Sequence, residues 1–155
     1  MNHQRRDTLK ASGSLGVLGL LAAAGLIKPE LAQAAWNKGA FEAHKMDEAL
    51  AAIGAGKPAD STDIQITAPD IAENGAVVPV GVVSNIPNTE SIAIMIEKNP
   101  AMLAATFEIP AGTIADVQTR VKMGQTSDVY AVVKADGKFY TTKKEVKVTL
   151  GGCGG

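Results

Sequence analysis

The only cysteine of this 155-residue chain is Cys153, which lies in a tail of glycines. Gly151 and Gly152 precede it, and Gly154 and Gly155 follow it. Because glycine has no Cβ and adopts many backbone conformations, we expect residues 151–155 to form a flexible arm. The thiolate of a cysteine is a nucleophile that forms disulfides and takes up oxidised sulfur groups. The tail is therefore predicted to present a reactive sulfur to another molecule.

The arm is long and thin enough to enter a neighbouring protein. Five extended residues span at most roughly 17 Å. The four glycines that flank Cys153 add no side-chain bulk, so the arm fits a narrow channel. An inert cysteine is usually buried, which a tail of this composition does not favour. A single cysteine in an exported protein indicates either pairing between molecules or a reactive thiol.

The first 34 residues resemble an export signal. Arg5 and Arg6 form a twin-arginine pair, an apolar run follows from Leu15 to Ile27, and residues 32–34 read Ala-Gln-Ala. This pattern predicts export by the twin-arginine route and cleavage after Ala34. The alternative is an uncleaved membrane anchor, but the apolar run is shorter than the roughly 20 residues that a bilayer span needs. We therefore expect a periplasmic protein without stable membrane insertion.

The export route itself predicts a partner. Twin-arginine export carries proteins that are already folded, usually with a cofactor or a second subunit. Since no cofactor motif is visible in the sequence, we expect a second subunit to be exported together with this chain.

Composition limits the other functions. The chain has 15 basic and 16 acidic residues and a net charge of −1. Such a balance gives no reason to expect binding to nucleic acid or to an anionic membrane surface. Removal of residues 1–34 leaves enough chain for one domain, residues 35–150, followed by the arm at 151–155.

Residues for catalysis are scarce. His44 is the only histidine after residue 34, and it is too far from Cys153 in sequence to suggest a metal site. The sequence has no Gly-x-Ser-x-Gly motif, no glycine-rich phosphate loop and no distinct carboxylate pair. We therefore predict no catalytic residues, no metal and no cofactor, and we expect His44 to be a surface or subunit-contact residue.

Four lysines precede the arm: Lys138, Lys143, Lys144 and Lys147. They could attract anions or lower the pKa of the Cys153 thiol if they lay beside it. They could equally lie on the solvated face of a strand, where the negative charge of Glu145 offsets part of their positive charge. The solvated face is the preferred interpretation.

The body of the chain is predicted to be a helix followed by strands. Apolar residues from about Ala40 to Ala55 recur at spacings of three and four, which indicates a helix that Gly54, Gly56 and Pro58 end. After Asp63 the period becomes two, which indicates strands. About seven strands are expected, near residues 64–67, 77–83, 92–96, 103–109, 117–123, 129–133 and 146–150.

The turns between these strands predict the topology. Asp136-Gly137 is a strong hairpin signal, and no helical period separates the strands. Proline lacks the N–H that a sheet needs, so the strand that contains Pro79 is expected to be an edge strand or bulged there. The predicted fold is mainly β: an antiparallel immunoglobulin-like β-sandwich of about seven strands, preceded by a short N-terminal helix.

The chain resembles the SoxY family, the sulfur-carrier subunit of the Sox sulfur-oxidation system. The terminal Gly-Gly-Cys-Gly-Gly at 151–155 is the most specific element of this resemblance. It also extends to further segments over nearly the whole of residues 35–155: Trp36-Asn37-Lys38, Thr67 to Gly75, Lys98-Asn99-Pro100 and Arg120 to Thr126.

The resemblance implies a mechanism and partners. Cys153 would carry the substrate as a covalent adduct on an arm formed by Gly151, Gly152, Gly154 and Gly155. A haem c enzyme would join thiosulfate to the thiol, a hydrolase would release sulfate, and a sulfane dehydrogenase with molybdenum and haem would oxidise the remaining sulfur. A small β-rich subunit, SoxZ, would form a heterodimer with the carrier. The chain itself would be no enzyme.

Two other functions remain open. In the first, Cys153 only makes a structural disulfide between molecules, for which a flexible arm is a poor support. In the second, the terminal Gly154-Gly155 carries a thiocarboxylate, as in ubiquitin-like carriers. That chemistry needs activation by ATP, which the periplasm does not supply, and it leaves Cys153 without a role.

Overall fold

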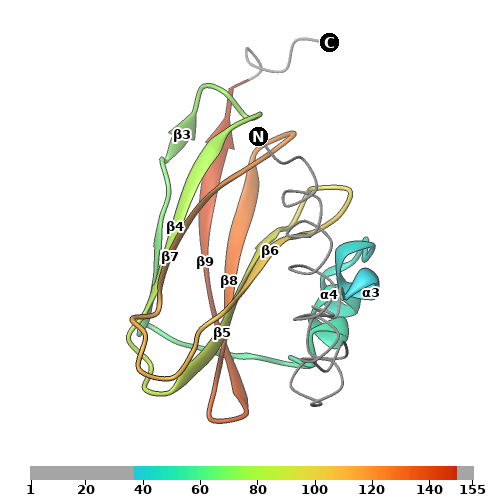
Figure 1. The fold of residues 1–155 in the computed structure, drawn as a ribbon. Coiled ribbons are helices and arrows are strands. Elements are labelled where there is room, and N and C mark those ends of the chain that lie inside the picture. The colour runs from blue at the N-terminus through green and yellow to red at the C-terminus, as the bar shows by residue number, and fades with distance from the viewer. Residues whose placement is uncertain (1–36, 150–155) are drawn as a thin grey trace, which may run out of the picture. The chain divides into compact units, whose positions relative to one another are not determined.

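The structure is a computed structural model and describes residues 37–149. Two short helices, α3 (Lys38–Phe41) and α4 (Met46–Ala52), precede the strands. Nine strands follow within the described residues: β1 (Ala59–Asp60), β2 (Ile64–Thr67), β3 (Ile71–Ala72), β4 (Val78–Ser84), β5 (Thr89–Ile96), β6 (Leu103–Glu108), β7 (Asp116–Val121), β8 (Ser127–Ala135) and β9 (Lys138–Val148). The protein is mainly β, as predicted (Figure 1).

The strands form two sheets that pack as a β-sandwich. The larger sheet has the order β1-β9-β8-β5-β6, and β3 also pairs with β9. The smaller sheet has the order β2-β4-β7. All the long strands are antiparallel to their neighbours, which confirms the predicted immunoglobulin-like sandwich.

The two shortest strands differ from this prediction. β1 and β3 run parallel to β9 and pair with its two ends, through Ala59 with Tyr140 and through Ile71 with Lys147. Strands of two residues are too short to show a period, so the sequence pattern does not reveal them.

The main core lies between the sheets. It is formed by one face of each long strand, with fully buried residues such as Val80 on β4, Ile94 on β5 and Val133 on β8. A second core lies on the other face of the larger sheet, where α3 and α4 pack. Ala93 and Met95 on β5 and Val132 on β8 belong to this second core. β5 and β8 are therefore covered on both faces, since helices cover one face and the smaller sheet the other (Figure 1).

The helical segment is divided, contrary to the prediction of one helix over about 40–55. The chain is extended at Lys45, with φ −129° and ψ 146°, and α4 begins only after it. Ala43 accepts a hydrogen bond from the Met102 N–H at 3.4 Å, and His44 Nδ1 bonds the Pro100 carbonyl. These bonds to the β5–β6 connection hold residues 43–44 out of helical geometry. The end is as predicted, with Gly54 and Gly56 at positive φ.

Two strand details also depend on pairing. Strict alternation along the strand predicted near 103–109 would place Leu103 on the same face as Ala105 and Phe107, and this is wrong. A register shift places Ala105 opposite Ile94 but Leu103 opposite Met95, so Leu103 joins the helix-side core.

Pro79 lies on the central strand of its sheet, but β2 pairs only with residues 81–84 of β4. At Pro79 only β7 is paired with β4, so the strand has one open side there, as a proline requires.

The predicted hairpin at Asp136-Gly137 is confirmed. Both residues have positive φ, 49° and 70°, and they join β8 to the long strand β9. β9 then runs from this hairpin to the opposite end of the sandwich, where the described chain ends at Thr149.

Candidate functional site at the end of the last strand

The end of β9 is held by hydrogen bonds from both sides. On one side Lys147 N–H donates to the Asp70 carbonyl at 3.0 Å, and Thr149 N–H donates to the Ala72 carbonyl at 3.1 Å. On the other side Val148 N–H donates to Thr126 Oγ1 at 3.0 Å. The backbone is therefore fixed as far as Thr149, four residues before Cys153.

Gly75 brings the connection between β3 and β4 against the end of β9. Its carbonyl accepts a hydrogen bond from Met123 N–H at 2.7 Å. A Cβ on Gly75 would lie 2.3 Å from the Met123 carbonyl oxygen and 2.8 Å from Val148 Cγ1. Only glycine allows this approach. The preceding residue, Asn74, closes the turn by accepting a bond from Ala76 N–H at 3.0 Å.

Asn99 ties two further loops together at the same end. Its Nδ2 donates to the Lys122 carbonyl at 2.7 Å, and its Oδ1 accepts from Gly124 N–H at 3.5 Å. Buried Ser127, at the start of β8, accepts from Lys98 N–H at 3.0 Å. The β5–β6 and β7–β8 connections are thus joined by side-chain bonds to backbone.

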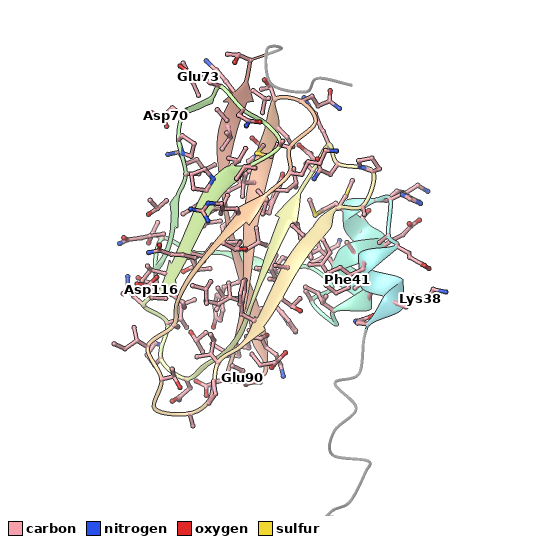
Figure 2. All side chains as sticks on the ribbon, turned by 45° about the horizontal axis from the view of Figure 1, so that its top comes forward. Lys38, Phe41, Asp70, Glu73, Glu90 and Asp116 are labelled. Carbon is pink, nitrogen blue, oxygen red and sulfur yellow. The ribbon has the colours of Figure 1, made fainter. Side chains whose placement is uncertain are left out.

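We call these segments the root cluster: residues 68–77, 97–102, 122–127 and 144–149. Sequence segments on which the family resemblance rests, at 67–75, 98–100 and 120–126, meet in this cluster. Figure 2 shows Asp70 and Glu73 at this end of the sandwich and Glu90 at the other end. The sequence alone does not reveal that these segments converge. In two of these segments Asn is followed by Gly or Pro, which indicates a turn. Such dipeptides do not indicate which turns lie together in the fold.

Two of the four lysines on β9 are held by ion pairs. Lys144 Nζ lies 3.0 Å from Asp70 Oδ1 and donates to the Ala68 carbonyl at 2.7 Å. Lys143 Nζ lies 2.7 Å from Asp128 Oδ2, and this hydrogen bond is the main reason that the pKa of Lys143 is raised. Lys138 is at the hairpin end of β9. Lys147, two residues before Thr149 in sequence, forms no ion pair with any of residues 37–149. This arrangement favours the solvated strand face.

Comparison with known proteins places the chain in a family. The family model for the sulfur oxidation protein SoxY matches residues 49–153. This range contains the root cluster and ends at Cys153. The chain belongs to the SoxY family.

A solved SoxY structure supports the same assignment. The sulfur carrier protein SoxY from Chlorobium limicola f thiosulfatophilum is 41% identical to this chain, with a TM-score of 0.61. The match covers 68% of this chain and 97% of the other. A superoxide reductase (neelaredoxin) from Ignicoccus hospitalis has a TM-score of 0.50 at 20% identity, over 68% of this chain and 93% of its own, which shows a shared fold. No curated relative matches the sequence.

The predicted site residues of this SoxY-family chain lie outside the described part. They are Cys153 with the arm residues Gly151, Gly152, Gly154 and Gly155, and the export residues Arg5, Arg6 and Ala34. What the structure describes is the strand end that precedes these C-terminal residues, where residues 144–149 are bonded to segment 68–72 and to Thr126.

His44 contacts the Pro100 carbonyl and so joins the helical segment to the β5–β6 connection. Residues 37–149 contain no group of three or more His, Cys, Asp or Glu side chains placed to hold a metal ion. Within the same residues, no helix is long and apolar enough to cross a membrane.

Proposed function

We propose that this chain is a periplasmic sulfur carrier that binds thiosulfate-derived sulfur covalently on Cys153 and presents it to the enzymes of a Sox pathway. One observation carries the proposal. The chain's single cysteine is four residues beyond Thr149, the residue that follows a strand end bonded on both sides. Four residues reach at most roughly 14 Å beyond Thr149. This is the arrangement expected of a short tether on a rigid base.

The first chemical step joins thiosulfate to the thiol. An S–S bond forms between the Cys153 sulfur and the sulfane sulfur of thiosulfate, the thiol proton is released, and two electrons leave. The product is a Cys–S–S–sulfonate. These electrons need an acceptor, which in this proposal is the haem c enzyme that couples the two sulfurs. The carrier supplies the nucleophile and no redox centre.

Later steps regenerate the carrier. Water attacks the sulfonate sulfur, the terminal S–S bond breaks, and sulfate leaves, so that Cys153 retains a persulfide. A sulfane dehydrogenase then accepts six electrons from the outer sulfur, which takes three oxygens from water and becomes a sulfonate on the Cys153 sulfur. A second hydrolysis breaks the remaining S–S bond, releases sulfate and frees the thiol. Each enzyme must admit the arm into its own active site, and the glycines at 151, 152, 154 and 155 keep the arm narrow enough for that.

The remaining parts of the proposal concern location and partners. Arg5, Arg6 and the cleavage site after Ala34 direct a folded protein through the twin-arginine route. A SoxZ-like β-rich subunit forms a heterodimer with this chain and accompanies it. The chain is a covalent substrate carrier without catalytic residues, metal or cofactor of its own.

The test is the intact mass of the protein from thiosulfate-grown cells, measured before and after treatment with a thiol reductant. We expect additions of sulfane sulfur or of a thiosulfonate group that the reductant removes and that are absent from Cys153→Ser. A mass that is unmodified, or that corresponds only to a disulfide-linked dimer, would contradict the carrier and favour the structural disulfide. The same spectrum locates the N-terminus, which we expect at Ala35.

A further inference from the structure

The chain has a single Asn-Gly dipeptide, Asn74-Gly75, which lies in the turn between β3 and β4. An asparagine can react with the backbone nitrogen of the next residue, which attacks the carbon of the side-chain amide. Glycine favours this reaction because it has no Cβ to obstruct the attack. Asn74 is exposed to solvent, so water can reach its amide. This turn therefore holds the two groups that such a reaction needs.

The backbone N–H of Gly75 has no hydrogen-bond partner among residues 37–149. Gly75 is nevertheless buried, and its carbonyl accepts a hydrogen bond from Met123 N–H at 2.7 Å. Buried backbone N–H groups nearly always have a partner, and an exception can mark a strained or reactive site. Within the described chain, attack by the Gly75 nitrogen would break no hydrogen bond of its own.

The side-chain amide of Asn74 is polarised by its surroundings. Its Oδ1 accepts a hydrogen bond from Ala76 N–H at 3.0 Å. A donor in this position stabilises the negative charge that develops on the oxygen when the amide carbon is attacked. The Asn74 carbonyl accepts from Val77 N–H at 3.3 Å, which fixes the backbone of the turn. The turn thus supplies an activated carbon next to a nitrogen without a partner.

The other asparagines of residues 37–149 lack this combination. In three of them the attacking nitrogen would belong to a residue with a larger side chain: Asn37-Lys38, Asn85-Ile86 and Asn88-Thr89. Two of these, Asn37 and Asn88, also use Nδ2 as a donor, at 2.6 and 3.1 Å. In Asn99-Pro100 the proline nitrogen has no proton to lose. The reaction is therefore expected to be selective for Asn74.

We propose that Asn74 is a site of self-modification, at which the chain cyclises and converts this asparagine to aspartate and isoaspartate. The Gly75 nitrogen loses its proton and forms a bond to Asn74 Cγ. The bond between Cγ and Nδ2 breaks, and ammonia leaves with that proton. Water then opens the five-membered imide at either of its two carbonyl carbons. No electrons are gained or lost, and water is the only co-reactant.

The two products differ in their effect on the root cluster. Aspartate keeps the length of the backbone and an oxygen that accepts from Ala76 N–H. Isoaspartate places the side-chain carbon in the backbone and so lengthens it. Gly75 has no room to shift, because a Cβ there would lie 2.3 Å from the Met123 carbonyl oxygen and 2.8 Å from Val148 Cγ1. We therefore expect the isoaspartyl form to lose the bond between Met123 N–H and the Gly75 carbonyl.

The test incubates the exported protein carrying Cys153→Ser, in which no disulfide can form, at mildly alkaline pH, because the attacking nitrogen must lose a proton. Peptide mapping by mass spectrometry follows the reaction. We expect the Asn74 peptide to gain the mass difference between NH2 and OH, in two isomers. This gain should be at least about tenfold faster than for the peptides that contain Asn37, Asn85 or Asn88. The reaction does not require Cys153, so its outcome is independent of the proposed function.

The isoaspartyl form can be separated from the parent protein by its extra negative charge. Its Met123 amide should exchange hydrogen at least about tenfold faster than in the parent. Asn74→Asp is the matched control, since it has the same charge and a backbone of normal length, and its Met123 amide should exchange within about threefold of the parent. Asn74→Ser keeps an oxygen for Ala76 N–H but has no amide to lose, so this peptide should not change in mass.

Three results would overturn the proposal. The first is an Asn74 peptide that stays unchanged in the folded protein but reacts after unfolding in urea, because the turn would then prevent ring closure. The second is a reaction at Asn74 no faster than at the other asparagines, which would remove the selectivity assigned to this turn. The third is equally fast exchange at Met123 in Asn74→Asp and in the isoaspartyl form, which would assign the loosening to charge and not to the longer backbone.

Discussion

Thr126 accepts a hydrogen bond from the backbone N–H of Val148 at 3.0 Å, although the two residues are 22 positions apart. Val148 is the last residue of β9, and Thr126 ends the connection from β7 to β8. A side chain therefore continues the pairing of β9 beyond Ser127 and Val146, the last residues paired between β8 and β9. The position of the end of β9 is set by this bond together with those to the Asp70 and Ala72 carbonyls.

Replacing Thr126 by Val should loosen the end of β9. Valine keeps the shape of threonine but removes the acceptor, which leaves the Val148 amide without its bond at a cost of about 1 kcal/mol. We expect a lower free energy of unfolding in urea and faster hydrogen exchange at the Val148 amide. Thr106→Val, at an exposed threonine on β6, is the control and should change neither by much. Equal effects of the two substitutions would show that the bond to Val148 contributes nothing.

Gly75→Ala should destabilise the protein strongly, by about 3 kcal/mol. The added methyl group would lie 2.3 Å from the Met123 carbonyl oxygen, a backbone atom that cannot rotate away. Gly124→Ala, in the same cluster, is the matched control, because a Cβ there meets no atom within 4 Å. Its effect on the free energy of unfolding should be within about 0.5 kcal/mol. Similar urea midpoints for the two variants would contradict the close packing described for Gly75.

Glu90 should make the stability of the hairpin end depend on pH. Its pKa is lowered from 4.5, chiefly by the hydrogen bond with Lys134, 2.6 Å away, and then by the Gly137 N–H. A carboxylate with a lower pKa in the folded state stabilises the fold above its unfolded pKa. That contribution is lost as the pH falls through the folded pKa.

We therefore expect Glu90→Gln to lower the thermal midpoint at neutral pH and to leave it unchanged once the pH is below the lowered pKa of Glu90. Glu73→Gln is the control, since no hydrogen bond or ion pair joins the Glu73 side chain to any of residues 37–149. It should have little effect at any pH. If the thermal midpoint of Glu90→Gln stayed below that of the parent protein by the same amount down to acidic pH, ionisation of Glu90 would be excluded as the cause.

Deletion of Gly154 and Gly155 distinguishes the carrier from a thiocarboxylate protein. If Cys153 carries the sulfur, the shortened arm keeps its nucleophile, and thiosulfate-dependent oxygen uptake should fall but persist. If the terminal carboxylate carries the sulfur, activity should be lost completely. Cys153→Ser is the reciprocal variant and should abolish activity only in the first case. Loss of activity in the deletion with full activity in Cys153→Ser would reject the carrier proposed here.

Periodicity and turn residues were sufficient to predict the long strands, the hairpin at Asp136-Gly137 and the end of the helical segment at Gly54. These features depend on neighbours in sequence: alternation sets the face of each side chain, and glycine sets where φ becomes positive. The lone cysteine and its glycines likewise led to the proposed chemistry without any tertiary information.

Tertiary structure decided features that depend on distant residues. Leu103 changed face because a register shift in its partner strand moved it, and the helix divided because Ala43 and His44 bond the β5–β6 connection. The meeting of Gly75, Asn99 and Thr126 around the end of β9 has the same origin. Side-chain alternation follows from the backbone of each strand alone, whereas sheet order and loop contacts follow from how whole faces are buried. For that reason the sequence alone was enough to predict Cys153 as the sulfur-carrying residue, whereas only the packed sandwich showed what holds the end of β9.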